Sequence, residues 1–412
     1  MEQAEIIALT HQTLPALGAY GDALTQDFYA HLFAHNPELK HTFNMANQAS
    51  GTQARALLDA IILFVSKLDQ LDTLGPQARM IAAKHVSLDI QPAHYALVGA
   101  SLLATFAEKL GPAATPAVMQ AWELAYMRIV AVLTGLEATA YQGHRTQPGG
   151  WLAFKGLRVA RTVAECADIR SFYLVAPDGQ PLPAYRPGQF VSVAVQVPGQ
   201  PYRQIRQYSL SDAPGQPYYR LTVRRQPAGH ETPAGLVSNY LHDDVRTGDT
   251  LLVHAPAGEF HLNVEVTTPL VLLAGGVGIT PLMAMLEQEL ATDGQREIRL
   301  LHAVRDADSQ LFAQRLRHLA QQHPRLRTFT LYQHVPAEVA GPDEAADQPE
   351  GPLNYGLLTA EHLLDFLADL PRNADCYCCG PLGFMRHTNQ LLRQQGFTHR
   401  HFEVFGPSQS LD

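Results

Sequence analysis

The sequence predicts a multidomain protein, with an all-α domain followed by an antiparallel β-barrel and then by an α/β domain with a parallel sheet. Three changes in the hydrophobic pattern predict this order. Apolar residues repeat with the helical period over residues 1–145 and alternate with polar residues over 152–264. From 265 to 412, short apolar runs alternate with helical segments. Residues 146–151 carry Gly and Pro without either pattern and are interpreted as a linker.

The first region has the periodicity of amphipathic helices. The segment "RALLDAIILFVSKL" places Leu58, Ile61, Ile62 and Val65 on one helical stripe. The segments "ASLLATFAEKL" and "VMQAWELAYMRIVAVL" repeat the same spacing. Almost no strand pattern interrupts these segments, so the region is predicted to be all-helical.

The second region has the two-residue period of β-strands. In "QFVSVAVQV", Val191, Val193, Val195 and Val197 alternate with small or polar residues. Turn-forming clusters such as "PDGQP", "VPGQP" and "PAGE" separate the strand-like runs at short intervals. Short strands joined by tight turns favour a small antiparallel barrel.

The third region alternates buried strands with helices. The run "PLVLLAGG" precedes the helical "PLMAMLEQEL", and "EIRLLHAV" precedes "QLFAQRLRHLA". The alternation continues to the final apolar run, "HFEVF". This order is typical of a doubly wound parallel sheet.

Composition excludes some classes of partner. The formal net charge is −9 and no block of basic residues is present, which argues against nucleic acid and anionic membrane surfaces. The N-terminal segment lacks a basic stretch before an apolar run, and no segment approaches the ~18 continuous apolar residues of a membrane span. We therefore expect a cytoplasmic protein without a stable membrane anchor.

The cysteines fit a reducing compartment. Cys166 stands alone, and Cys376, Cys378 and Cys379 crowd into "CYCC", which lacks the C-x-x-C spacing of zinc and thioredoxin-type sites. Reduced, buried thiols are the favoured interpretation.

A glycine-rich turn follows the first strand of the third region. In "LVLLAGGVGITPLMAML", Gly275, Gly276 and Gly278 would let the backbone approach a phosphate-bearing ligand at the start of a helix. The turn does not match the full G-x-G-x-x-G fingerprint, however, and glycine also serves tight strand-to-helix packing. Both interpretations stay open from the turn alone.

Other segments offer aromatic and polar groups to a planar ligand. "RQYSLS" (Arg206–Ser211) sets a cation, an aromatic ring and a hydroxyl in succession, and "FEVFG" (Phe402–Gly406) adds a second aromatic. Each could be an ordinary strand, or the two could clamp a planar ring. With "RPGQF", "GLVSNYL", "GGVGITP" and "CCGPLGFM" in order, residues 152–412 resemble the ferredoxin-NADP reductase superfamily.

This resemblance implies FAD and NAD(P)H sites, with the turn from Gly275 to Pro281 holding NAD(P)H and with Cys379, Gly380 and Pro381 beside the nicotinamide. It places Arg206 at the FAD pyrophosphate, Tyr208 on the isoalloxazine, Ser209 near the flavin N5, Ser238 at the pyrophosphate and Phe405 across the flavin. Phe190 stands where relatives often have Tyr and keeps the aromatic packing. The implied cofactor-binding set in these domains is Phe190, Arg206, Gln207, Tyr208, Ser209, Ser238, Gly275, Gly276, Val277, Gly278, Ile279, Thr280, Pro281, Cys379, Gly380, Pro381, Val404, Phe405 and Gly406.

A reductase attached to a helical domain needs an electron acceptor there. His85, in "ARMIAAKHVSLDIQPAHY", could be an ordinary core histidine or the axial ligand of a haem. Gln53 and Leu57 lie one helical turn apart and could face the same pocket. His94 is interpreted as an ordinary neighbour of Tyr95.

Together with "NPELKHTFNMANQ" and "KHVSLDIQPAHY", these residues resemble the globin domain of the flavohaemoglobins, so that the resemblance covers essentially the whole chain. It implies haem b, with His85 as the proximal iron ligand. The other residues that it implies are the distal pair Tyr29 and Gln53, the pocket residues Phe43 and Leu57, and a proximal relay of Tyr95 and Glu137.

The resemblance implies a nitric oxide dioxygenase. NO and O2 would be the substrates and NADH or NADPH the donor, with electrons passing through FAD to haem and nitrate as the product. Arg305 could meet a 2′-phosphate, but Asp306 and Asp308 beside it favour NADH. The alternatives are an NO reductase or alkyl hydroperoxide reductase on the same cofactors, or an O2 or NO sensor or carrier. We expect a monomer.

Overall fold

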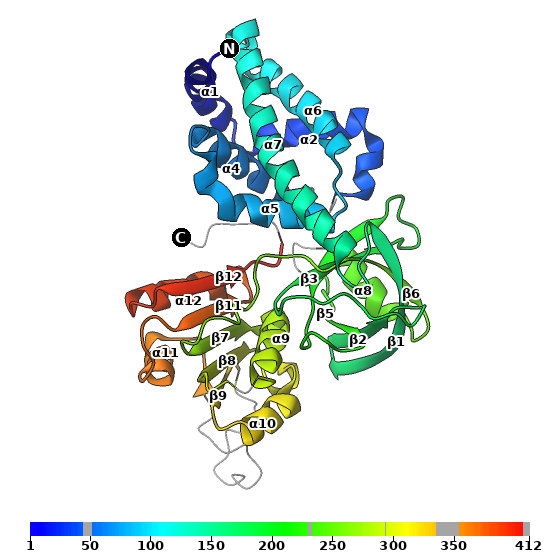
Figure 1. Ribbon diagram of the computed structural model, residues 1–412, viewed down its shortest axis with the longest axis vertical. Coiled ribbons are helices and arrows are strands. Elements are labelled where there is room, and N and C mark those ends of the chain that lie inside the picture. Colours follow the sequence, from blue (N-terminus) through cyan, green and yellow to red (C-terminus); the bar gives the residue numbers. More distant parts are fainter. Residues whose placement is uncertain (44–51, 230–232, 293, 335–353, 407–412) are drawn as a thin grey trace.

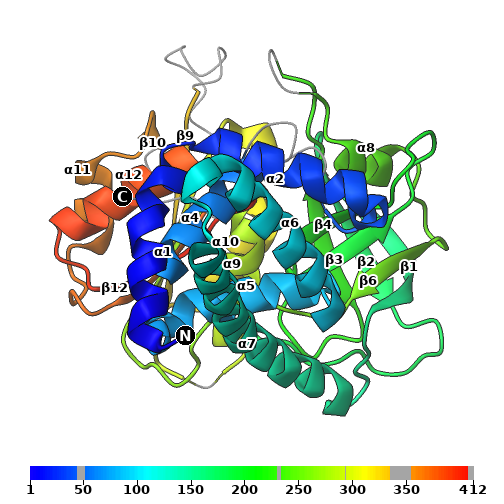
Figure 2. The same ribbon diagram turned by 90° about the horizontal axis from the view of Figure 1, so that it is seen from above.

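The computed structural model describes residues 1–43, 52–229, 233–292, 294–334 and 354–406. A helical domain occupies the upper part of Figure 1, with the β-barrel below it on the right and the α/β domain below it on the left. Seen from above, the helices lie over both other domains (Figure 2). The predicted fold class and the order of its parts are confirmed.

The helical domain packs around a core of large apolar side chains, including Phe28, Leu32 and Phe106. Its helices are α1 (Gln3–Gly18), α2 (Asp22–His35), α4 (Thr52–Ser66), α5 (Gly75–Ser87), α6 (Pro92–Leu110) and α7 (Pro116–Thr146), with 3-10 turns at Pro37–His41, Leu71–Leu74 and Gly111–Ala113. The side chain of Thr115 caps the start of α7 by accepting from the backbone N–H of Val118 (3.3 Å). From there, α7 runs down to the barrel (Figure 1).

The barrel is an antiparallel sheet whose strands follow the order β4-β3-β6-β1-β2-β5. Its elements are β1 (Phe154–Cys166), β2 (Ile169–Val175), β3 (Phe190–Val195), β4 (Gln204–Ser209), β5 (Tyr219–Arg224), α8 (Leu236–Asp243) and β6 (Thr250–His254). A bridge between Leu210 and Leu221 brings the two ends of the sheet together. The valines of β3 point into the barrel core, as their alternation predicts.

The α/β domain has a parallel sheet in the order β10-β9-β8-β7-β11-β12. Its elements are β7 (Leu270–Gly275), α9 (Ile279–Leu290), β8 (Ile298–Val304), α10 (Ala313–Gln322), β9 (Leu326–Tyr332), β10 (Asn354–Tyr355), α11 (Ala360–Leu367), β11 (Asp375–Cys379), α12 (Leu382–Gln394) and β12 (His399–Glu403). The strand order reverses between β7 and β11. Ligands of such sheets bind outside the carboxyl ends of the strands at this switch point.

The cysteines are free, as the sequence predicts, and the three on β11 are buried. Burial raises the pKa of the Cys376 thiol to about 12 and that of Cys379 well above the ordinary range, so both stay protonated and unreactive. No helix in the described ranges is both long and apolar enough to span a membrane.

Candidate active site

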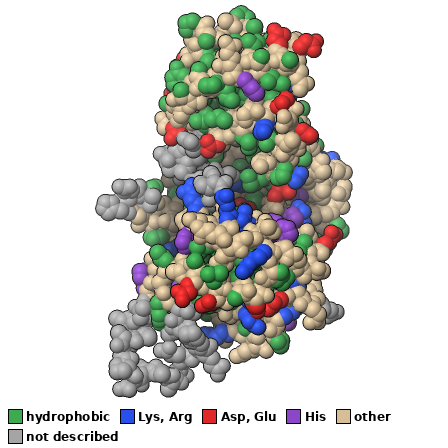
Figure 3. Space-filling view, turned by 90° about the vertical axis from the view of Figure 1, so that its left-hand side faces the viewer, with side chains coloured by type: hydrophobic (Ala, Val, Ile, Leu, Met, Phe, Trp, Pro, Cys, Tyr) green, Lys and Arg blue, Asp and Glu red, His purple; other side chains and the backbone are tan. Residues whose placement is uncertain are grey.

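One cavity of about 1940 Å³ lies where the three domains meet. Its walls carry His85 from the helical domain, Arg206 from the barrel and Thr280 from the α/β domain. Figure 3 shows the surface hollowed at the junction between the helical domain and the two lower domains. A single space therefore connects the predicted haem site with the predicted flavin site.

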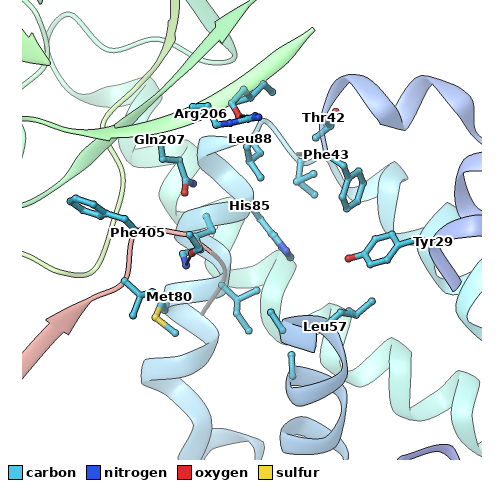
Figure 4. A pocket seen from close by; sticks show the side chains of 18 of the residues that line it. Tyr29, Thr42, Phe43, Leu57, Met80, His85, Leu88, Arg206, Gln207 and Phe405 are labelled. Carbon is cyan, nitrogen blue, oxygen red and sulfur yellow. Dashed lines mark hydrogen bonds between the residues drawn. The ribbon is translucent and has the colours of Figure 1, made fainter. Parts of the chain in front are cut away.

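His85 lies in the last turn of α5 and is held by residues from two other helices. Its Nδ1 is 2.9 Å from the hydroxyl of Tyr95 on α6 and 2.9 Å from a carboxylate oxygen of Glu137 on α7. The Tyr95 hydroxyl also donates to Glu137 (2.5 Å). Because a carboxylate can only accept, the proton of the imidazole is held on Nδ1, and the ring projects into the cavity (Figure 4).

This network is shielded from solvent. Glu137 is 2% exposed and Tyr95 is 8% exposed. Burial, followed by the hydrogen bond to Glu137, raises the pKa of Tyr95, so its hydroxyl keeps its proton across the physiological range. The backbone carbonyl of Tyr95 accepts from the Tyr126 hydroxyl of α7 (2.7 Å), which joins the two helices that carry the partners of His85.

Tyr29 faces His85 across the cavity (Figure 4). Its ring comes from α2 and stacks on Phe33, with ring centroids 5.8 Å apart, while Phe43 meets it edge-on at 5.8 Å. Leu57 on α4 lines the same space. Gln53, the predicted partner of Tyr29, belongs to α4, but its side chain lies outside the described residues.

The chemistry of this end fits a haem. A planar apolar macrocycle needs apolar walls, and side chains such as Val98, Phe106 and Leu133 supply them. Its iron needs one imidazole whose second nitrogen donates to a carboxylate or carbonyl. His85 with Glu137 provides that donor set.

Four of the predicted residues at the flavin end come from one strand, β4. Arg206, Gln207, Tyr208 and Ser209 line the cavity in succession. The other predicted residues that line it are Phe190, Ser238, Val404, Phe405 and Gly406. Burial lowers the pKa of Arg206 and raises that of Tyr208, which leaves the guanidinium charged and the phenol neutral at physiological pH. A cation, a ring and a hydroxyl in one partly buried groove fit the pyrophosphate and ring system of FAD.

Two hydrogen bonds join α5 to the flavin end. The Gln207 amide donates to the Ser87 hydroxyl (2.9 Å), and the Lys84 ammonium donates to the backbone carbonyl of Gly406 (3.3 Å). Lys84 and Ser87 flank His85 in the sequence. The sequence offered no sign of their role, because a contact between domains leaves no local pattern.

The glycine-rich turn meets the end of β11 closely. A Cβ at Gly278 would lie 2.2 Å from the carbonyl oxygen of Cys379, and one at Gly275 would lie 2.9 Å from Phe384 and Pro381. Gly276 has a φ of +53°. Tight packing therefore accounts for Gly275 and Gly278 before any ligand is considered.

The same turn reaches the cavity at Val277 and Thr280. Among the described residues that the sequence assigned to the nucleotide site, the following do not line the cavity: Gly275, Gly276, Gly278, Ile279, Pro281, Cys379, Gly380 and Pro381. They lie at the carboxyl ends of β7 and β11, in the turns that follow these strands, and in the first turn of α9, all beside the switch point. The sequence did not indicate a role for His302 on β8, whose Nε2 lies 3.0 Å from the backbone carbonyl of Gly276. Burial lowers the pKa of His302 to about 4. The imidazole is therefore neutral, and its Nε2–H donates to that carbonyl.

Comparisons with known families agree with this architecture. Residues 26–133 match the Globin family, 156–262 the oxidoreductase FAD-binding domain and 272–390 the oxidoreductase NAD-binding domain. A flavohemoprotein from Deinococcus radiodurans is 41% identical, with 98% of this chain and 96% of that protein covered. One from Chromobacterium violaceum is 43% identical, with 97% of each covered.

Solved structures show the same arrangement. The flavohemoglobin of Malassezia yamatoensis, described with bound FAD and heme, superposes with a TM-score of 0.83 over 98% of this chain and 99% of its own, at 24% identity. The FAD/NAD-binding domain of a nitric oxide dioxygenase from Vibrio cholerae covers 62% of this chain and 100% of its own, with a TM-score of 0.52 and 35% identity.

Proposed function

The chain belongs to the flavohemoprotein family, with a globin domain and FAD- and NAD-binding oxidoreductase domains, and from this premise we propose that it is a nitric oxide dioxygenase. The reaction is 2 NO + 2 O2 + NAD(P)H → 2 nitrate + NAD(P)+ + H+. Its role would be the detoxification of NO. The observation that carries the proposal is the cavity that His85 and Arg206 both line.

The proposal assigns each cofactor to residues of that cavity. His85 would ligate haem b, β4 with Phe190, Ser238 and Phe405 would hold FAD, and the turn before α9 would hold the nucleotide. Haem supplies O2 chemistry, and FAD takes two electrons from a nicotinamide and releases them singly. NADH is the proposed donor, because the Arg305 guanidinium donates to Asp306 (2.7 Å) and its charge is already balanced.

On the proximal side, Glu137 and Tyr95 set the properties of His85. Glu137 accepts from Nδ1 and so fixes the tautomer in which Nε2 carries the lone pair that would bind iron. A carboxylate partner also makes the imidazole a stronger electron donor, which favours O–O chemistry over reversible storage.

On the distal side, Tyr29 offers a hydroxyl in an apolar, aromatic pocket. A phenol there would donate to a diatomic substrate that carries partial negative charge, and a charge-assisted hydrogen bond is stronger than a neutral one. The rings of Phe33 and Phe43 hold Tyr29 in place. O2 would therefore be retained long enough for NO to reach it.

The test is consumption of NO by protein loaded with haem and FAD and supplied with NADH. We expect rapid, O2-dependent loss of NO with nitrate formed in equal amount. Nitrous oxide formed without O2 would point to an NO reductase, and NADH oxidation driven only by organic hydroperoxides would point to a hydroperoxide reductase. Binding of O2 or NO without turnover would leave a sensor or carrier.

A further inference from the structure

Two buried carboxyl groups meet where the barrel and the α/β domain pack together. Asp212, shortly after β4, is 6% exposed, and Glu287 on α9 is 9% exposed. Their side chains lie within hydrogen-bonding reach of each other. The helices α9 and α10 lie on the barrel side of the α/β domain in Figure 1.

Each carboxyl group has a cation from its own domain. On the barrel side, Arg220 of β5 lies 3.3 Å from Asp212, which also accepts from the Tyr218 hydroxyl (3.0 Å) and the backbone N–H of Ala213 (3.0 Å). On the other side, the Arg315 guanidinium of α10 donates to Glu287 (2.9 Å). The carboxyl groups themselves connect the domains.

Other contacts around the two acids show that the barrel and the α/β domain are closely packed here. The Arg220 guanidinium lies over the ring of Phe312, 4.8 Å from its centroid. Phe312, just before α10, is buried and has a φ of 59°, a conformation that an aromatic residue adopts only when its surroundings hold it. A Cβ at Gly188 of the barrel domain would lie 2.4 Å from the Met285 methyl group of α9.

The charges around the pair favour one shared proton. Burial, then the hydrogen bond with Asp212, raises the pKa of Glu287 to about 7. Burial alone would raise the pKa of Asp212, but the hydrogen bond from Glu287 and the charge of Arg220 hold it below its ordinary value. Like charges in contact cannot both ionise cheaply, so the pair titrates as one unit.

We infer that the proton shared by Asp212 and Glu287 holds the α/β domain against the barrel in the orientation that hydride transfer from nucleotide to flavin requires. The two acids are positioning residues, since Glu287 lies on the helix whose first turn carries Thr280 into the cavity. A shift of α9 moves that turn relative to Tyr208 and Ser209. The inference rests on the reductase part of the proposed function and is independent of the final electron acceptor.

The neighbouring groups do not titrate in the same range. Burial alone would lower the pKa of Arg220, but the charges of Asp212 and Glu287 raise it above its ordinary value, so its guanidinium stays charged. Among the tyrosines, burial raises the pKa of Tyr218 to about 12 and that of Tyr185, whose hydroxyl donates to the Asp212 carbonyl (2.5 Å), further still. Among the groups that contact the pair, a change of charge near neutral pH therefore belongs to the two acids.

The experiment is anaerobic stopped-flow reduction of the bound flavin by NADH, in the haem- and FAD-loaded protein, from pH 5.5 to 9. A carboxyl whose pKa is raised in the docked state stabilises docking below that pKa and loses the effect as pH rises through it. For a rise from 4.5 to about 7, we expect the rate to fall by up to about tenfold between pH 6 and pH 8 and then to level off.

Glu287→Gln keeps a donor to Asp212 but cannot lose a proton, so its rate should hardly vary with pH. The matched control is Glu289→Gln, a buried acid on the same helix that pairs with Arg296 (3.4 Å) inside the α/β domain; it should keep the wild-type profile. An unchanged profile in Glu287→Gln would overturn the inference.

Infrared titration of the wild-type holoprotein gives a second measurement, and its main result does not depend on whether any variant folds. We expect the C=O stretch of a protonated carboxyl to disappear near neutral pH and to be missing or shifted in Asp212→Asn. If no protonated carboxyl is present at pH 6, the inference fails. If the flavin is reduced normally but NO is not consumed, the proposed activity fails and the inference stands.

Discussion

The two ends of the cavity are built in opposite ways. At the haem end, His85 depends on Tyr95 and Glu137, which lie 10 and 52 residues away in the sequence and on different helices. At the flavin end, Arg206 to Ser209 are consecutive residues of one strand. The hydrogen bonds of His85 depend on residues from several helices, so a change in any one of them disturbs the others. On a strand, each side chain contacts the ligand separately, so a change in one leaves the rest in place. Mutations should therefore act sharply at the first end and more gradually at the second.

The largest expected effect is that of His85→Ala, which breaks the haem end alone. The variant should either lose haem or turn over NO about 100-fold or more slowly, because the proposed function makes His85 the imidazole that would hold the haem iron. Reduction of ferricyanide by NADH, which needs only the flavin end, should stay within twofold of wild type. His94→Ala is the control from the same segment, and its absorption spectrum should remain that of the wild-type haem protein. A wild-type Soret spectrum in His85→Ala would contradict the assignment.

Next in size is Glu137→Gln, which keeps the shape of the proximal network but removes its charge. If His85 holds the haem iron as proposed, we expect NO turnover or haem affinity to fall by about 10- to 100-fold, as is typical when the hydrogen-bonding partner of a metal-binding histidine is changed. Because the pKa of Tyr95 is raised, its hydroxyl stays protonated and the wild-type network should hold its form up to pH 9. Glu123→Gln changes an exposed acid of the same helix and should have no effect. Equal behaviour of the two variants would show that the carboxylate does not tune His85.

Tyr29→Phe tests the hydroxyl that faces His85 at the haem end. The ring keeps its contacts with Phe33 and Phe43, so the pocket should stay intact while the distal hydroxyl is lost. One hydrogen bond contributes about 1 to 1.5 kcal/mol, so O2 should dissociate about tenfold faster. Flash photolysis of the O2 complex measures this rate directly, with Tyr20→Phe, an exposed tyrosine, as the control. An unchanged O2 dissociation rate would remove Tyr29 from the distal site.

The same contrast explains what the sequence could predict. Hydrophobic periodicity is local, so it predicted the three kinds of domain, and "RQYSLS" was visible because its residues are consecutive. The relay of His85, Tyr95 and Glu137 came from family resemblance alone, because its members are distant in sequence. The contact of Gln207 with Ser87 left no trace in the sequence, since it depends on how two domains are placed.

The meeting of Asp212 and Glu287 was hidden for the same reason. The role of the glycine-rich turn could be predicted only in part. From the sequence, Gly278 could equally contact a ligand or allow tight packing. Only the structure, which places the carbonyl of Cys379 beside it, identifies the packing role. Sequence patterns report what neighbours along a strand or helix do, and a contact between separate domains has no such pattern.

The smallest expected effect lies between the two ends. Gln207→Met removes the hydrogen bond to Ser87 while it keeps the length of the side chain, and Ser87→Ala removes the same bond from the other side. A neutral hydrogen bond contributes about 0.5 to 1.5 kcal/mol, so each variant should slow reduction of the haem by the flavin by about three- to tenfold. In Ser87→Ala, which leaves the side chains of the flavin end intact, reduction of the flavin by NADH should be unchanged. If this hydrogen bond positions the two ends relative to each other, the double variant will be no slower than either single variant. Each single substitution already removes the whole interaction. Additive losses would mean that the two side chains act separately, and the hydrogen bond between them would then not be what connects the two ends.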